Sequence, residues 1–94
     1  MKKLSSDEVA ERLASLPQWK LDGDRLYREI RFSTFARAFG FMAAAALVCE
    51  RMDHHPEWLN SYDRLQVWLS THDAGGITER DFALARALDQ LPVS

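Results

Sequence analysis

The chain has 94 residues, 47% of them hydrophobic, and 12 Lys and Arg against 14 Asp and Glu give a net charge of -2. This length fits one domain over residues 1–94, and the charge argues against a general nucleic-acid binder, which usually carries a basic excess. No apolar run follows the first lysines, so a signal peptide is not expected, and the longest apolar stretch is far below the about 20 residues of a membrane span. The single Cys49 has no disulfide partner in the chain. We therefore expect a cytoplasmic protein.

The N-terminal segment carries the signals of a helix. Ser5 and Glu8 have the spacing of a capping box, in which each side chain satisfies the other's backbone N–H. Apolar residues follow at helical spacing, and Pro17 ends the pattern, so a helix is predicted from Ser5 to Pro17. Its apolar stripe consists of Val9, Leu13 and Leu16.

A hairpin is predicted next. Residues 19–21 and 26–32 have strand character, and Asp22-Gly23-Asp24 between them is typical of a hairpin loop. Arg28 interrupts an otherwise apolar face of the second strand. One face carries Leu26, Ile30 and Phe32, and the other carries Tyr27, Glu29 and Arg31.

A long apolar helix is predicted over Phe35–Met52, capped by Ser33 or Thr34. Arg37 is its only strongly polar residue before Glu50, and a helix this apolar is buried on more than one side. We expect its second face to pack against another subunit, and a wide core face with some exposed alanines is the alternative. The two stripes are Phe35, Phe39, Met42, Ala46 and Cys49, and Ala38, Phe41, Ala45, Val48 and Met52.

The C-terminal part predicts a second hairpin and a third helix. Strands over residues 58–62 and 65–72 flank a turn at Asp63-Arg64, and Thr78 caps the helix with Asp81 at its third position. Pro92 closes that helix, whose apolar stripe is Leu84, Leu88 and Leu91. The order α-β-β-α-β-β-α predicts an α+β fold, a four-stranded antiparallel sheet with three helices packed on one face.

Three histidines lie at the predicted ends of elements, where functional side chains are often displayed. His54 and His55 follow the long helix, and His72 ends the fourth strand. Imidazole changes charge near neutral pH, which suits proton transfer. Each histidine taken alone has the alternative of a surface or capping role.

A metal site is a rival interpretation. Glu50 and His54 are four residues apart on the last helical turn, a spacing that can present two ligands on one face. However, the sequence has no Cys-x-x-Cys or His-Glu-x-x-His motif, and the adjacent His54 and His55 point apart in any regular structure. Cys49 lies inside the apolar helix, where a thiol is usually inert. We expect no metal and no cofactor.

Together these residues resemble the signature of the pterin-4a-carbinolamine dehydratases. The resemblance rests on Glu50-x-x-x-His54-His55-Pro56, then Tyr62, His72 and Asp81 at the family's intervals, and spans nearly the whole chain. It implies dehydration of 4a-hydroxytetrahydrobiopterin to quinonoid dihydropterin, which recycles the pterin of aromatic amino acid hydroxylases. It also implies the same α-β-β-α-β-β-α fold.

The resemblance also implies roles for individual residues. His54 and His72 correspond to the acid and base, His55 and Pro56 shape the pterin site, and the main chain at 71–73 contacts the ring. Trp19 offers an aromatic face, while Glu50, Arg80 and Asp81 orient the histidines or line the mouth, although Asp81 is also explained as a helix cap. The catalytic candidates are His54, His55 and His72, and the binding candidates are Trp19, Glu50, Pro56, Thr71, Asp73, Arg80 and Asp81.

The family's partners are expected here only in part. A homodimer or homotetramer through Phe35–Met52 and a functional link to an aromatic amino acid hydroxylase are implied. Mammalian members also bind a homeodomain transcription factor through the long helix, and the alanine-rich version here gives no reason to expect that role. Asp73-Ala74 replaces their Glu-Cys, and activity is expected to survive the change. The alternative to an enzyme is a non-catalytic pterin-binding or protein-partner regulatory module.

Overall fold

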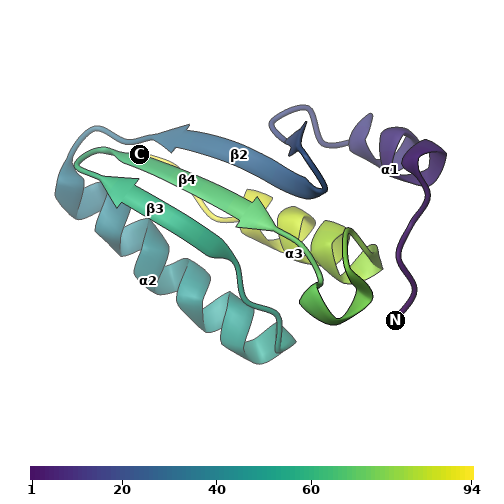
Figure 1. The fold of residues 1–94 in the computed structure, drawn as a ribbon. Helices are drawn as coiled ribbons and strands as arrows, with labels where there is room; N and C mark the ends of the chain where they lie inside the picture. The colour runs from purple at the N-terminus through teal and green to yellow at the C-terminus, as the bar shows by residue number, and fades with distance from the viewer.

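The computed structural model describes residues 1–94 and confirms the predicted α+β fold (Figure 1). A short 3-10 turn, His72–Ala74, is the one helical segment that the sequence pattern did not indicate. In chain order the elements are α1 (Ser6–Leu13), β1 (Lys20–Asp22), β2 (Arg25–Arg31), α2 (Phe35–Met52), β3 (Glu57–Ser61), β4 (Arg64–Leu69) and α3 (Glu79–Asp89).

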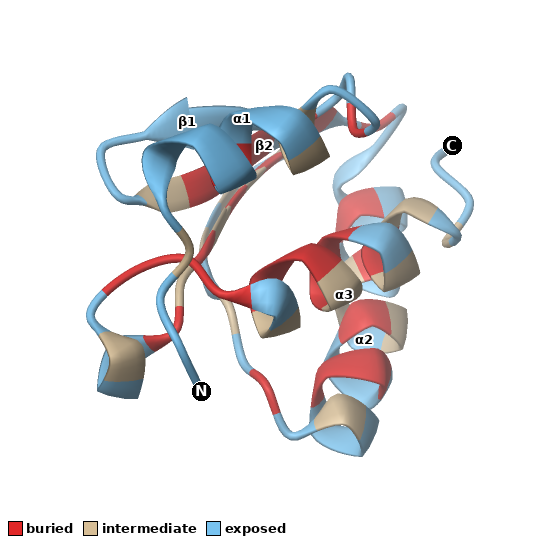
Figure 2. Ribbon diagram, turned by 90° about the vertical axis from the view of Figure 1, so that its right-hand side faces the viewer, coloured by how far each residue is buried: buried red, intermediate tan, exposed pale blue.

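The four strands form one antiparallel sheet in the order β1-β2-β4-β3. On the two central strands alternate residues are buried, so one face of the sheet is apolar, as the alternation predicted. Helices α2 and α3 lie on that face, while the opposite face carries no helix (Figures 1 and 2). Val9 of α1 joins the same cluster of 19 buried apolar residues.

Several predicted boundaries are wrong by a few residues. Helix α1 ends at Leu13, and Leu16 packs in the core from the turn before Pro17, because a residue that precedes proline is disfavoured in the helical conformation. The second hairpin turns at 62–63 rather than 63–64, with Tyr62 in the left-handed region at φ 54.

The fourth strand also ends early, at Leu69 rather than at His72. The backbone N–H of Thr71 bonds the carbonyl of Gly76, which closes a tight loop around the 3-10 turn. His72 therefore begins this turn instead of ending a strand. The loop, drawn green after β4 in Figure 1, leaves the sheet and leads into α3.

Helix α2 has the predicted bounds, and its second face has no partner within the chain. Thr34 is the cap, and the buried side contains the second of the two predicted stripes together with Cys49. On the other side Phe35, Phe39 and Leu47 are 48%, 58% and 70% exposed. No helix of the protein combines the length and apolar character that a membrane crossing requires.

Candidate active site

The three histidines are brought together at one edge of the molecule. Asp53 ends α2 in the left-handed conformation at φ 50, and this turn directs the chain through His54 and His55 into β3. The loop after β4 brings His72 to the same place from the neighbouring strand. A hollow of about 220 Å³ lies between these segments, lined by Asp53, His54, His55, Ser70, Thr71, His72, Asp73 and Arg80.

The start of α3 closes the hollow from a third direction. The guanidinium of Arg80 donates a hydrogen bond to the carbonyl oxygen of Asp53, which ties the first turn of α3 to the last turn of α2. Thr78 caps α3 and Asp81 completes the predicted capping box. Three elements therefore converge on the hollow, and His54 is buried where they meet.

His54 is fixed by a buried carboxylate. Its Nε2 lies 2.6 Å from Oδ1 of Asp81, a residue with 0% exposure, and His54 itself is only 8% exposed. The other oxygen of Asp81 accepts hydrogen bonds from Thr71 Oγ1 and from the backbone N–H of Thr78, each at 2.9 Å. Three donors around two oxygens suit a carboxylate, so the cap and the orienting role of Asp81 are combined in one side chain.

This pairing decides which nitrogen of His54 is free for chemistry. When Asp81 accepts from Nε2, that nitrogen carries a hydrogen, and Nδ1 is the remaining site for a proton. Nδ1 has no hydrogen bond within the protein, yet no side-chain nitrogen or oxygen is both buried and unpaired. Nδ1 therefore keeps some contact with solvent, and the His54 side chain is among those that line the hollow.

His55 and His72 are less constrained. Nε2 of His55 lies 2.7 Å from Oε1 of Glu50, and both side chains are exposed. His72 is exposed and makes no hydrogen bond to another side chain, so its ring is free to meet a ligand. Glu50 contacts His55 whereas His54 contacts Asp81, and no group of three or more His, Cys, Asp or Glu side chains is arranged to hold a metal ion.

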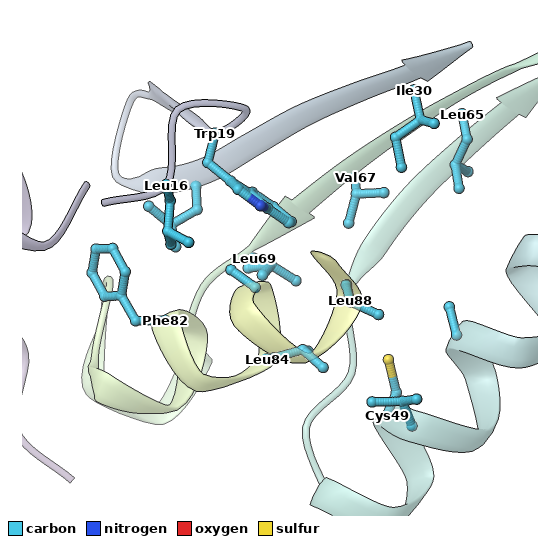
Figure 3. Packing of buried hydrophobic residues seen from close by; sticks show 14 of the residues in the cluster. Leu16, Trp19, Ile30, Cys49, Leu65, Val67, Leu69, Phe82, Leu84 and Leu88 are labelled. Carbon is cyan, nitrogen blue, oxygen red and sulfur yellow. The ribbon is translucent and has the colours of Figure 1, made fainter. Parts of the chain in front are cut away.

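Four predicted binding residues do not line this hollow. Glu50 and Asp81 contact the lining residues His55 and His54, and the other two are Pro56 and Trp19. Pro56, which is half-buried, follows His55 directly in the chain. Trp19 is 3% exposed and packs among the core residues between the sheet and α3 (Figure 3). Its Nε1 donates to Oδ1 of Asp89 at 2.9 Å, so its polar edge is already used.

Three residues that build the site are absent from the predicted site residues. The carbonyl oxygen of Asp53 accepts a hydrogen bond from Arg80, and carbonyls at the end of a helix are often free to accept in this way. Ser70 lines the hollow although the sequence predicts it only as part of a strand, and Thr78 is predicted only as a helix cap. The hydroxyl of Thr78, 2.7 Å from that of Thr71, gave no signal in the sequence because residues at 71 and 78 meet only through the loop.

Comparisons with known proteins point to one family. The profile of the family described as "Pterin 4 alpha carbinolamine dehydratase" matches residues 2–91. A protein of Solibacter usitatus, provisionally named pterin-4-alpha-carbinolamine dehydratase, is 52% identical over 89 residues, which are 95% of this chain and 94% of that protein. The crystal structure of a transcriptional coactivator/pterin dehydratase from Brucella melitensis has a TM-score of 0.89 at 44% identity, over 94% of this chain and 96% of that one.

A more distant structure shares the fold alone. A pterin dehydratase-like protein identified as a RuBisCO assembly factor in the alpha-carboxysome has a TM-score of 0.65 at 23% identity. The match covers 77% of this chain and 86% of that chain. The same architecture thus occurs in proteins described by different roles, and the role of this chain has to be argued from its own site.

Proposed function

The chain belongs to the pterin 4 alpha carbinolamine dehydratase family, and from this premise we propose that it catalyses the family's reaction. The substrate is 4a-hydroxytetrahydrobiopterin, and the products are quinonoid dihydropterin and water. The observation that carries the proposal is the placement of His54 and His72 on one hollow, with His54 locked by Asp81.

The reaction needs two proton transfers and no electron transfer. The bond between C4a and the hydroxyl oxygen breaks as that oxygen receives a proton and leaves as water. The proton on ring N5 is removed, and its bonding pair forms the C4a=N5 double bond. His54 and His72 divide these two tasks, because imidazoles near pH 7 can supply one acid and one base. This chemistry requires neither a metal nor a redox cofactor.

The remaining residues bind the ring. Thr71 and Asp73 flank His72 and line the hollow, while His55 lines it from the segment after α2, with Pro56 next to it in the chain. Arg80 and the carboxylate of Asp73 line the hollow and can pair with the polar edge of a pterin. Glu50 acts on the site only through His55. Trp19 contributes by packing beneath the sheet edge rather than through its bonded N–H.

A variant series tests the catalytic assignment. His54→Ala would leave Asp81 buried without its partner, so His54→Gln, whose amide can still donate to Asp81, is the better substitution. The double variant His54→Gln with His72→Ala should lose most of the protein's acceleration of 4a-hydroxytetrahydropterin decay. The decay is measured by stopped-flow absorbance on protein that has been treated with a chelator. Arg31→Ala, at the other end of the sheet, is the control. Full activity in the double variant would exclude the acid/base roles.

The alternative is a module that binds a pterin, or holds a protein partner, without turnover. It predicts that the wild-type protein binds a pterin, as measured by fluorescence quenching, and does not change the decay rate of 4a-hydroxytetrahydropterin. A rate enhancement by the wild-type protein that is lost in the double variant would exclude it.

The proposal also includes partners and location. We propose that two or more copies associate through the exposed side of α2, because Phe35, Phe39 and Leu47 form an apolar face with no cover in the chain. An aromatic amino acid hydroxylase is the class of enzyme that supplies the substrate. We place the protein in the cytoplasm, where the unpaired Cys49 would remain a thiol.

A further inference from the structure

A second hollow lies on the far side of His72. It has a volume of about 310 Å³ and shares Ser70, Thr71 and His72 with the hollow described above. Its remaining lining residues are Asp24, Arg25, Gly75 and Gly76. Asp24 lies in the β1–β2 turn, which reaches the site because Leu26 at the start of β2 is paired with Leu69 at the end of β4. His72 therefore stands between two neighbouring hollows.

The second hollow is lined only by polar residues and glycines. Arg25 is held in place by Glu57 at 3.1 Å and Asp22 at 3.7 Å, and its guanidinium lies 5.2 Å from the ring centre of Trp68. Asp24 has no ion-pair partner, and the hydroxyl of Ser70 makes no hydrogen bond to the protein. The wall thus offers a fixed donor, a free acceptor and a free hydroxyl.

The charge around this hollow is negative. Arg25 and Lys3, whose side chain packs against Gly76, are outnumbered by Asp22, Asp24 and Glu57. An anionic group would meet net repulsion there, while a hydroxylated neutral group would find both donors and acceptors. A methyl group in the same place would form no hydrogen bonds with these side chains, which would then bond only to water.

The chemistry of the substrate connects the two hollows. In a tetrahydropterin, N5 is bonded to both C4a, where the hydroxyl leaves, and C6, which carries the side chain. A ring whose N5 and C4a lie between His54 and His72 therefore has C6 directly bonded to the reacting edge, and the C6 substituent is two bonds from N5. With His72 at that edge, the substituent can pass it and enter the second hollow.

We propose that the hollow lined by Asp24, Arg25 and Ser70 is a subsite for a neutral polyhydroxyalkyl group at C6 of the pterin, and that it sets substrate preference. This inference rests on the proposed dehydratase function for its kinetic readout. The expected order of kcat/KM is polyhydroxyalkyl first, methyl second, and an anionic aminobenzoylglutamate side chain last. Asp24 is a specificity residue, since it touches the side chain and not the reacting atoms.

The test compares three 4a-hydroxytetrahydropterins that differ only at C6. Asp24→Ala should reduce the preference for polyhydroxyalkyl over methyl about fivefold to tenfold, the usual effect of one lost hydrogen bond. Asp24→Lys should raise the relative kcat/KM of the anionic substrate. Asp63→Ala is the matched control, because Asp63 lies in the β3–β4 turn at the opposite end of the sheet. Unchanged ratios in both Asp24 variants would overturn the subsite.

A binding measurement separates this inference from the proposed function. Stable oxidised pterins with the same three C6 groups are titrated into the wild-type protein and the Asp24 variants by fluorescence quenching. If the affinities follow the same order, and Asp24→Ala reduces the differences between them, the subsite is supported even if no carbinolamine is turned over. Equal affinities for all three overturn it even if the protein proves to be an active dehydratase.

Discussion

The hydroxyl of Thr71 is the residue-scale feature with the clearest consequence. It donates to Asp81 and lies 2.7 Å from the hydroxyl of Thr78, inside a buried network that ends at His54. Removing it leaves Asp81 with one donor fewer while the shape of the side chain hardly changes. The carboxylate would then hold the His54 ring less firmly, and reactions are sensitive to such misplacement.

We therefore predict that Thr71→Val lowers the free energy of unfolding by about 1–3 kcal/mol and kcat about tenfold. Thr71→Ser keeps the hydroxyl and should retain most of both. Urea unfolding and the dehydratase assay measure the two quantities, and the pH profile of kcat should change shape only in the valine variant. A valine variant equal to the serine variant in activity would show that the network does not position His54.

Residue identities in the site were predictable because the family pattern fixes them, whereas their contacts were not. The sequence indicated that His54 and His55 point apart, and one is buried against Asp81 while the other is exposed beside Glu50. It gave no way to know that Trp19 would be enclosed in the core with its N–H bonded to Asp89. Such contacts join residues at opposite ends of the chain and depend on the final packing.

At the scale of elements, helix α3 is held at both ends by polar contacts. Its first turn is held by Asp81, and near its C-terminus Asp89 accepts from Arg28 at 2.7 Å and from Trp19 Nε1 at 2.9 Å. Arg28 lies on the buried face of β2 at 6% exposure, and burial, opposed by Asp89, lowers the pKa of its guanidinium. The arginine that interrupts the apolar face in the sequence is therefore the anchor of α3 on the sheet.

Asp89→Ala should leave Arg28 buried without its partner. We predict a loss of about 2–3 kcal/mol in unfolding free energy, at the lower end of the range for broken buried pairs because Asp89 is partly exposed. The double variant Arg28→Met with Asp89→Leu should recover much of that loss, since no charge is then buried unpaired. Thermal unfolding of wild type, Asp89→Ala and the double variant measures these differences. A double variant less stable than Asp89→Ala would contradict this account.

The capping box of α1 predicts a dependence on pH. The backbone N–H of Ser5, together with its hydroxyl, lowers the pKa of the Glu8 carboxyl. Since the folded-state pKa is the lower one, Glu8 stabilises the protein above its unfolded-state pKa, and this contribution is lost as pH falls through the folded-state pKa. Glu8→Gln should therefore be less stable than wild type at pH 7, with the two converging in acid.

Urea unfolding midpoints at about pH 7 and about pH 3 give the comparison, since an unperturbed glutamate titrates near 4.3. Glu11→Gln, an exposed acidic position on the same helix outside the capping box, is the matched control. A difference between Glu8→Gln and wild type that is the same at both pH values would show that the charge of Glu8 plays no part in the cap.

Element boundaries show where sequence patterns succeed and where they fail. Both ends of α2 were predicted correctly, because Thr34 caps its start and apolar periodicity runs without a break to Met52. The end of β4 was not, because alternation continues through Thr71 although the sheet hydrogen bonding stops at Leu69. Alternation reports which face a side chain takes, while the end of a strand depends on a partner that lies elsewhere in the chain.

At the scale of the whole molecule, the apolar content of the sequence is divided between two places. One part forms the single core between the sheet and the helices (Figure 3). The other part lies on the exposed side of α2. There the ring centres of Phe35 and Phe39 are 6.0 Å apart, and both side chains are exposed. The two stripes predicted from the sequence are thus used differently, since one packs in the protomer's own core and the other reaches it only through Met42 and Cys49. Contiguous apolar surface of this kind marks an interaction site.

We predict that a charge placed in this face prevents self-association. Phe39→Asp would bury an unpaired carboxylate in any interface between two α2 helices, and the desolvation of that group opposes assembly. Sedimentation velocity should show wild type as a dimer or larger and Phe39→Asp as a smaller species with unchanged circular dichroism. Leu21→Asp is the control, since Leu21 is a similarly exposed apolar residue on β1, which lies away from α2 (Figure 2). If wild type is a monomer, or if Phe39→Asp leaves the assembly intact, the α2 face does not join copies of this chain.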